Sequence, residues 1–290
     1  MSYTGRFAPS PSGPLHRGSL LTAVASFLDA RASGGQWLLR IEDTDHQRSY
    51  AHYADLIQQT LHTYGLLWDG LVLKQSDRLP TYLDHIDHLA AHQHLYNCNC
   101  SRAQRRGQPR YPGHCRQHVD LLRPEHSWRL RVADLSVSFN DLLHGPQQYH
   151  LPSTSGDIIL RRRDGDIAYA LAVVVDDADS GVTHVVRGSD LLADTAVQIY
   201  LQQLLGLPSP VYMHIPVLLD ASGRKYSKQN HAPAIPLDEP TPTLLDILKL
   251  LGHPAPASMH GASTQDLLAY TTLHWQRTKL PRTLTLADRP

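Results

Sequence analysis

The chain has 290 residues, and its 27 lysines and arginines balance its 27 aspartates and glutamates. This length allows a sizeable core with two or three structural modules, and the balanced charge gives no global basic field of the kind that attracts nucleic acid. No apolar run approaches the roughly 20 residues of a membrane span, and the start lacks a secretory signal pattern, so we expect a cytoplasmic protein without membrane association.

The first elements predict a strand–loop–helix–strand unit. Residues 2–7 suit a short strand, and apolar residues at helical spacing predict a helix over 18–33 that Gly34 and Gly35 end. The run "QWLLRIE" (36–42) predicts a buried strand. This order is typical of the βαβ unit of a parallel sheet. Two further helices are predicted, over 49–64 and 79–95.

The composition changes near residue 97, which indicates an insert. Short alternating runs such as "SWRLRV" and "LSVSF" predict a compact, largely β segment over 96–165. Buried strands are then predicted for "YALAVVVDD" (169–177) and "VTHVVRG" (182–188), followed by a helix over 191–205. The last part holds a strand-like "YMHIPVLLD", a polar loop "ASGRKYSKQN" and helices, one of them between Thr241-Pro242 and Gly252.

We therefore predict an α/β fold in four segments. Residues 1–95 and 166–211 form the two halves of a parallel-sheet catalytic domain, which residues 96–165 interrupt. Residues 212–290 form the polar loop and a helical C-terminal region.

The loop after the first strand is a candidate phosphate site. The sequence contains neither G-x-x-x-x-G-K-[ST] nor G-x-G-x-x-G, so the two commonest phosphate-binding loops are absent. In "GRFAPSPSGPLHRGSLLTA" (5–23), Gly18 and Ser19 bring free backbone N–H groups to a helix N-terminus, and His16 can donate to phosphate oxygens. The alternative is a proline-rich turn that merely links strand to helix.

A second candidate lies in the polar loop "GRKYSKQN" (223–230). Lys225 and Lys228 place two ammonium groups three residues apart, which suits the charge that builds on a leaving pyrophosphate. The alternative is a solvated basic turn.

Cys98, Cys100 and Cys115 are the only cysteines and lie within 18 residues of one another. Three thiolates need a fourth ligand to close a tetrahedral, structural zinc site, and base rates favour a histidine such as the nearby His114 or His118. A metal-free core with three reduced cysteines is the alternative.

Arginines surround the cysteines, and no acidic residue lies between 101 and 119. They favour an RNA-backbone surface, with a solvated basic face as the alternative. These arginines are Arg102, Arg105, Arg106, Arg110 and Arg116, and Arg161, Arg162 and Arg163 either extend the surface or flank the next strand.

The two loops resemble the signatures of class I aminoacyl-tRNA synthetases, "HIGH" as "HRGS" (16–19) and "KMSKS" as "KYSKQ" (225–229). The stretches "RFAPSPSGPLH", "LLRIEDTD", "AVVVDDADSGVTHVVRGSDLL" and "KYSKQN" are similar to the glutamyl branch, in the right order and over nearly the whole chain. Ser19, Tyr226 and Gln229 depart from the general signatures. The closest resemblance is to the short glutamyl-queuosine tRNA(Asp) synthetases, because the chain ends soon after the second loop and carries the cysteine cluster.

This resemblance implies a Rossmann-like parallel sheet with a zinc-containing insert and a short helical C-terminal region, without an anticodon-binding domain. It implies that His16, Gly18, Lys225 and Lys228 are catalytic and that His16, Gly18, Ser19 and Lys228 bind ATP. It also implies that Tyr111 is the fourth ligand of one structural zinc ion, beside Cys98, Cys100 and Cys115.

The resemblance further implies an amino-acid site for L-glutamate. Its residues are Arg6, Phe7, Ala8, Pro9, Ser10, Glu42, Tyr169 and Arg187. Glu42 would meet the α-ammonium, and Tyr169 and Arg187 would hold the side-chain carboxylate, which arginine can grip with two parallel hydrogen bonds. From the residues alone, a strand-end arginine paired with Asp190 is an equal alternative for Arg187.

Glu42 belongs to a cluster of carboxylates that also suits magnesium. We favour amine recognition by Glu42 and structural roles for Asp43 and Asp45, with Mg²⁺ arriving together with ATP.

The implied activity is that of a ligase, which forms glutamyl-adenylate from ATP and glutamate and transfers glutamate to the queuosine of tRNA(Asp). Positioning and electrostatics would supply the catalysis, with no covalent nucleophile. Three alternatives remain: a truncated glutamyl-tRNA synthetase that charges the tRNA 3′ end, a noncatalytic RNA-binding paralogue, and another adenylylating enzyme of the same superfamily.

Overall fold

The computed structural model describes residues 2–288 apart from 102, 106, 108–109, 118–121 and 227–231. Its central sheet has two parts, with strand orders β1-β2-β3 and β7-β6-β10-β9. The Thr183 amide, just before β9, donates to the Thr4 carbonyl of β1 at 2.9 Å, so the two parts adjoin. The strands are β1 (Thr4–Phe7), β2 (Gln36–Ile41), β3 (Leu73–Lys74), β6 (Ser136–Asp141), β7 (Gly145–His150), β9 (His184–Gly188) and β10 (Val211–Ile215).

All pairings in the central sheet are parallel except that of the β6–β7 hairpin. This confirms the parallel sheet that the βαβ pattern predicts. The hairpin lies in the segment predicted as an insert, yet β6 pairs with β10 through Asp141 and Tyr212. The hairpin thereby brings Asp141 into the buried interior beside β10.

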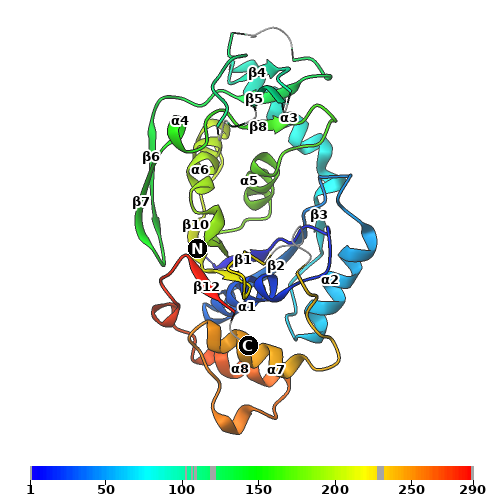
Figure 1. The fold of residues 1–290 in the computed structure, drawn as a ribbon, viewed down its shortest axis with the longest axis vertical. Coiled ribbons are helices and arrows are strands. Elements are labelled where there is room, and N and C mark those ends of the chain that lie inside the picture. Colours follow the sequence, from blue (N-terminus) through cyan, green and yellow to red (C-terminus); the bar gives the residue numbers. More distant parts are fainter. Residues whose placement is uncertain are drawn as a thin grey trace.

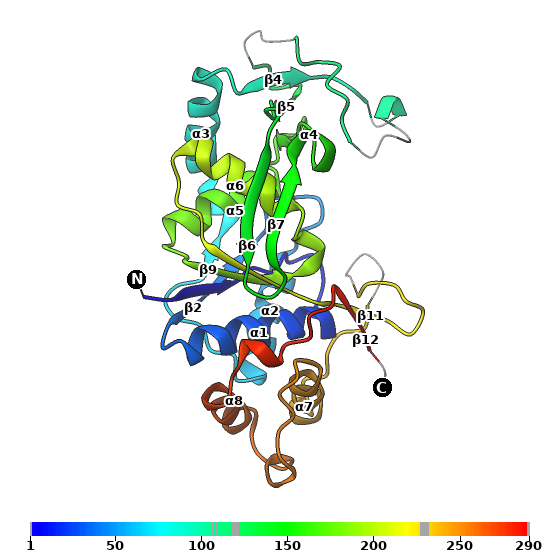
Figure 2. The ribbon, with the colours of Figure 1, turned by 90° about the vertical axis from the view of Figure 1, so that its left-hand side faces the viewer.

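Helices cover both faces of this sheet (Figures 1 and 2). On one face lies α1 (Arg17–Ala32), and on the other lie α5 (Tyr169–Asp179) and α6 (Asp194–Leu205). Because side chains alternate along a strand, Val186 and Met213 join the core around α1, while Val185 and Tyr212 join the core around α5 and α6. The flanking helices are α2 (Ala51–Thr63) and α3 (Leu79–Ala91).

A smaller antiparallel sheet stands at one end of the molecule, at the top of Figure 1. It consists of β4 (Leu95–Cys98), β5 (Ser127–Leu130) and β8 (Ile159–Arg161), and the short α4 (Leu151–Thr154) lies nearby in sequence. This sheet carries the cysteines and confirms β structure in the segment.

The C-terminal part places its two helices beyond α1, at the bottom of Figure 2. It contains α7 (Pro240–Leu250) and α8 (Thr264–Leu273), and β11 (Val217–Leu219) pairs with β12 (Thr285–Ala287). Gly252 follows α7 with a φ of +76°, as expected of a helix stop. Among the described residues, no helix has the length and apolar character to cross a membrane. Short 3₁₀ turns are η1 (Gln75–Arg78), η2 (Ala103–Arg105), η3 (Ser189–Leu191), η5 (Ala257–Met259) and η6 (Arg277–Lys279).

One predicted element is wrong. Residues 169–177 were expected to form a buried strand, and they form α5 instead. Side chains 171–177 are all buried, Asp176 and Asp177 included, so the helix has no exposed face over this run. An apolar run that is buried on every side carries no periodicity, and β-branched residues then favour the wrong element.

Candidate active site

Two adjoining cavities open at the ends of β1 and β9. The first has a volume of about 450 Å³, and the second about 390 Å³. Their sizes suit small-molecule sites. Both are lined by Phe7, Ala8, Ser10 and Gly188, so a ligand can extend from one into the other. Pro9 lines the first cavity and accepts a 3.0 Å hydrogen bond from the Glu42 amide, which fixes the loop against the end of β2.

The first cavity surrounds the N-terminus of α1. His16 caps this helix, since its Nδ1 accepts a hydrogen bond from the Ser19 amide at 3.1 Å. That bond leaves the ring proton on Nε2, which lies 3.2 Å from the Ser19 hydroxyl. A side chain on Gly18 would place its Cβ 3.2 Å from the His16 ring and 3.4 Å from Tyr226. The Ser19 amide, expected to be free, is therefore used by the His16 cap, and the cavity is lined by His16, Gly18 and Ser19 at the start of the helix, a position that suits phosphate.

The described part of the polar loop lines the same cavity. Lys225 and Tyr226 line it, and the Lys225 ammonium pairs with Asp190 at its wall. The structure thus brings His16, Gly18, Ser19 and Lys225 together around one space. Lys228 lies outside the described residues.

The second cavity is lined by Arg6, Glu42, Tyr169 and Arg187, which join Phe7, Ala8 and Ser10 there. The structure thereby brings the predicted amino-acid residues together. Arg6 and Arg40 both bind the buried Asp177, at 3.1 and 2.6 Å, and Arg40 also reaches Glu42 at 3.2 Å. Burial raises the pKa of Glu42, and Arg40 only partly opposes the shift. Glu42 is therefore a largely desolvated carboxylate at a cavity wall, suited to an ammonium group.

Arg187 lines the same cavity and is held there by four hydrogen bonds. Its guanidinium donates to Tyr169 Oη, Thr195 Oγ1, Gln198 Oε1 and His214 Nε2 at 2.7–3.2 Å. Asp190 pairs with Lys225 instead, so the alternative of an Arg187–Asp190 pair is not borne out. Burial raises the pKa of Tyr169, so its hydroxyl keeps its proton and can donate to an anion.

Sequence reasoning missed His214 and Asp141. His214 is fully buried on β10, and its Nδ1 lies 2.7 Å from Asp141 Oδ2. Burial lowers the pKa of His214 to about 4 against the opposing pull of Asp141, so the ring is neutral. A polar residue inside the apolar strand "YMHIPV" was the available signal, but pattern alone does not show which side chain it meets.

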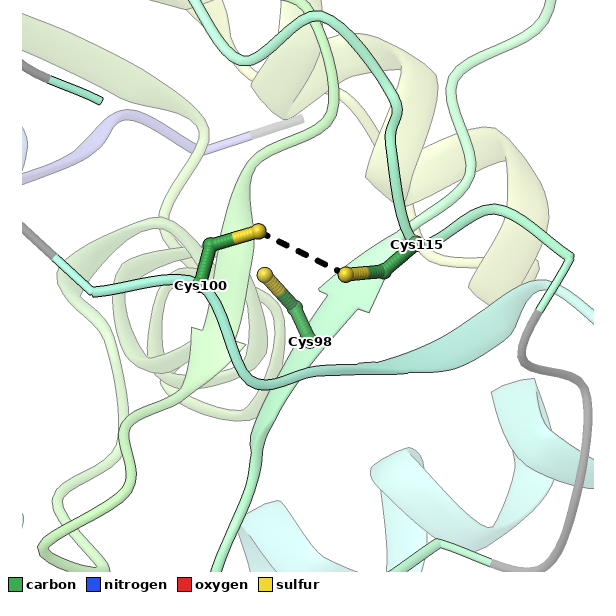
Figure 3. Close-up of side chains that lie close together, drawn as sticks. All are labelled: Cys98, Cys100 and Cys115. Atoms are coloured by element: carbon green, nitrogen blue, oxygen red, sulfur yellow. Dashed lines mark hydrogen bonds between the residues drawn. The ribbon is translucent and has the colours of Figure 1, made fainter. Parts of the chain in front are cut away.

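The three cysteines converge as predicted, and their sulfur atoms lie within 4.8 Å of one another (Figure 3). The Cys100 and Cys115 sulfurs are 3.5 Å apart, and Tyr111 Oη is 3.5 Å from Cys100 Sγ. Burial opposes ionisation of Cys98, but hydrogen bonds from Arg129 and Tyr111 prevail and lower its pKa to about 7. This donor set can hold a metal ion such as zinc.

Tyr111 is suited to act as an oxygen ligand. Its hydroxyl accepts a 2.8 Å hydrogen bond from the Cys115 amide, and the Arg129 guanidinium lies 3.9 Å from its ring centre. Both contacts favour negative charge on the phenolic oxygen, but burial and hydrogen bonds with the three cysteines outweigh them and raise the pKa of Tyr111. His114 lies beside the Tyr111 ring, and His118 falls outside the described residues.

Asp43 and Asp45 have structural roles, as predicted. Asp43 accepts hydrogen bonds from the amide and hydroxyl of Ser76, and Asp45 pairs with Arg48 and Arg162.

The predicted basic surface is only partly available for RNA. Arg116 is bound to Asp157 at 2.6 Å, and Arg162 is paired with Asp45 and Asp164, so neither guanidinium stands alone. Arg110 is exposed, whereas the side chains of Arg102, Arg105 and Arg106 lie outside what the structure describes.

Comparison with known proteins agrees with this geometry. The family model of the catalytic domain of class I tRNA synthetases (E and Q) matches residues 3–280. The chain is 22% identical, with a TM-score of 0.81, to a glutamate tRNA ligase from Elizabethkingia meningosepticum in complex with its amino acid, covering 100% of this chain and 67% of that one. A glutamate-tRNA synthetase from Elizabethkingia anophelis is likewise 22% identical, with a TM-score of 0.82, over 100% of this chain and 68% of that one. The chain therefore belongs to the class I tRNA synthetases, with a glutamyl-type catalytic fold.

The curated relatives narrow the family. The chain is 49% identical to the glutamyl-Q tRNA(Asp) synthetase of Thiobacillus denitrificans, over 96% of this chain and 94% of that protein. It is 47% identical to the protein of the same name from Ectopseudomonas mendocina, over 99% of this chain and 98% of that protein. Within its class, the chain belongs to the glutamyl-Q tRNA(Asp) synthetase family.

Proposed function

We propose that this protein activates L-glutamate with ATP to form glutamyl-adenylate and transfers the glutamyl group to the queuosine of tRNA(Asp). The observation that carries the proposal is the pair of adjoining cavities, one built around a helix N-terminus and the other between Glu42 and Arg187. An anionic nucleotide suits the first, and an amino acid with a side-chain carboxylate suits the second. A cytoplasmic location remains a prediction.

In the second cavity, Glu42 would accept hydrogen bonds from the α-ammonium of glutamate. Tyr169 and Arg187 would donate to its side-chain carboxylate. The loop of Arg6, Phe7, Ala8, Pro9 and Ser10 would then direct the α-carboxylate toward the first cavity. These assignments follow the charges of the side chains, because an anion and a cation line the same cavity.

In the first cavity, the α-carboxylate oxygen would attack the α-phosphorus of ATP as the bond to pyrophosphate breaks. His16, the amide of Gly18 and the hydroxyl of Ser19 would stabilise the phosphate oxygens, and Lys225 and Lys228 would stabilise the leaving pyrophosphate. Lys225 would first leave Asp190. Mg²⁺ would arrive with ATP and neutralise part of its charge.

The second half-reaction would consume glutamyl-adenylate. A hydroxyl oxygen of the queuosine cyclopentene ring would attack the activated carbonyl carbon, and AMP would leave as the hydroxyl loses its proton. The product is an ester on the tRNA anticodon.

Cys98, Cys100, Cys115 and Tyr111 would hold one zinc ion in a closed structural site. Three sulfur atoms and one phenolic oxygen complete a tetrahedral set, so the ion would stabilise the small antiparallel sheet that carries them.

The test of this function supplies ATP, radiolabelled glutamate and tRNA(Asp) with or without queuosine. We expect label only on the queuosine-bearing tRNA. Label on the 3′ adenosine of tRNA(Glu) would instead establish the alternative of a truncated glutamyl-tRNA synthetase. Exchange between ATP and pyrophosphate that responds to another acid, and not to glutamate, would establish a different adenylylating enzyme.

A further inference from the structure

The surroundings of Arg187 have a feature that recognition of its ligand alone does not require. Arg187 on β9 and His214 on β10 are directly paired across the sheet, and both side chains point to the face covered by α6. Thr195 and Gln198, one helical turn apart on α6, approach the guanidinium from that helix. Thr195, Gln198 and His214 are nearly fully buried, and we call these three residues the neutral cage.

The neutral cage uses most of the hydrogen-bonding capacity of Arg187. A guanidinium has five N–H donors. The Nε proton goes to His214, and the two Nη2 protons go to Thr195 at 2.8 Å and Gln198 at 2.7 Å. One Nη1 proton goes to the hydroxyl of Tyr169, so a second Nη1 proton is left for a ligand in the second cavity.

Every one of these acceptors is uncharged. His214 is neutral because burial lowers its pKa to about 4, and its Nδ1 proton is donated to Asp141, which leaves Nε2 as an acceptor. Among the described residues, no carboxylate forms an ion pair with Arg187, although Arg6, Arg17, Arg31, Arg40 and Arg277 each have a carboxylate partner. Asp194, the first residue of α6, is influenced by the charge of Arg187 without bonding to it.

A buried cation that has full hydrogen bonding but no counter-charge favours an anionic ligand. A carboxylate that enters the second cavity gains the whole charge of Arg187, whereas a carboxamide gains only a hydrogen bond. A protein carboxylate in the cage would neutralise Arg187 in advance and remove this difference.

We propose that the neutral cage is the specificity determinant that makes the amino-acid site select a side-chain carboxylate over a carboxamide. This inference rests on the proposed function, because it concerns the choice between glutamate and glutamine at the same site. Thr195, Gln198 and His214 act through Arg187 and are positioning residues.

The sharpest test is Gln198→Glu, which keeps the size of the side chain and adds one negative charge 2.7 Å from Nη2. The assay measures ATP–pyrophosphate exchange with L-glutamate and, separately, L-glutamine. We expect kcat/KM for glutamate to fall about 100-fold, mainly through KM, and the glutamate-to-glutamine ratio to fall at least about tenfold.

The matched control is Gln202→Glu. Gln202 lies one turn further along α6, is equally buried, and bonds to Tyr212 and Ser209 rather than to Arg187. The control should keep the ratio within about threefold of the wild-type value. Gln198→Met, which removes the acceptor without adding charge, should also preserve the ratio.

Thr195→Asp offers an independent route if Gln198→Glu does not fold. It places a carboxylate beside the same Nη2 group, in the first turn of α6, where a negative charge suits the helix. It should lower the ratio as Gln198→Glu does.

The outcomes separate the two proposals. If the wild-type protein shows no glutamate-dependent exchange, the proposed function fails. If the wild-type protein prefers glutamate and both Gln198→Glu and Thr195→Asp keep its glutamate-to-glutamine ratio, the neutral cage is not the determinant. The same conclusion follows if Gln202→Glu and Gln198→Met lower this ratio as much as Gln198→Glu does.

Discussion

Glu42 and Asp177 are buried carboxylates that share the guanidinium of Arg40, yet their pKa values move in opposite directions. Burial opposes the ionisation of both groups. At Asp177 the charges of Arg40 and Arg6 outweigh burial and lower the pKa, whereas at Glu42 burial prevails and raises it. Asp177 therefore stabilises the fold, and Glu42 keeps a carboxylate at the cavity at a cost in stability.

Replacement of Asp177 by Asn tests the first half of this contrast. The change should lower the free energy of unfolding at pH 7 by about 3–5 kcal/mol, because it leaves buried guanidinium charge without its partner. A lowered folded-state pKa contributes stability above the ordinary value of 3.8 and loses it as the pH falls through the folded pKa. Urea unfolding between pH 7 and pH 3 should show the difference shrinking only below pH 3.8. A difference that is constant with pH would contradict this account.

Replacement of Glu42 by Gln tests the second half. A raised folded-state pKa gives stability below the ordinary value of 4.5 and loses it as the pH rises, so at pH 7 the neutral variant should be at least as stable as the wild type. Its kcat/KM for glutamate should fall about 100-fold or more, because the amide no longer matches the ammonium. Thermal unfolding measures the stability of the variant, and ATP–pyrophosphate exchange measures its kcat/KM for glutamate. A marked loss of stability, or unchanged activity, would show that Glu42 is structural.

At the scale of elements, the sequence indicated most of the fold and misassigned one part. The periodic segments predicted α2 and α3, because each buries one face and exposes another, and apolar spacing also predicted α1, which is buried over most of its length. The segment that forms α5 has no such contrast, since both sheet and helices surround it. This error matters for the site, because Tyr169 reaches Arg187 from the first turn of that helix.

The small antiparallel sheet carries its own prediction. Tyr111→Phe removes only the phenolic oxygen beside the cysteine sulfurs, so its zinc affinity should be at least about tenfold lower than that of the wild type. Cys100→Ser should lower the zinc affinity further. Competition with a chelator measures this affinity. His114→Ala, the matched test of the alternative ligand, should leave it unchanged. If His114→Ala lowered the zinc affinity and Tyr111→Phe left it unchanged, the fourth ligand would be His114 and not Tyr111.

At the scale of the whole molecule, the local motifs predicted the two walls of the first cavity but not the supports behind the second. His16, Gly18 and Lys225 stand in short recognisable stretches. The link from Asp141 through His214 to Arg187 joins β6, β10 and β9, and only strand pairing reveals it. Such contacts depend on register between distant segments, which composition and spacing do not encode.

The two adjoining cavities are the central claim of this account, and a crystal structure with a non-hydrolysable analogue of glutamyl-adenylate tests them most directly. We expect the side-chain carboxylate against Arg187 and Tyr169, the amino group against Glu42, and the phosphate mimic against His16 and the start of α1. An analogue bound in the reverse direction, or with its carboxylate away from Arg187, would contradict the account.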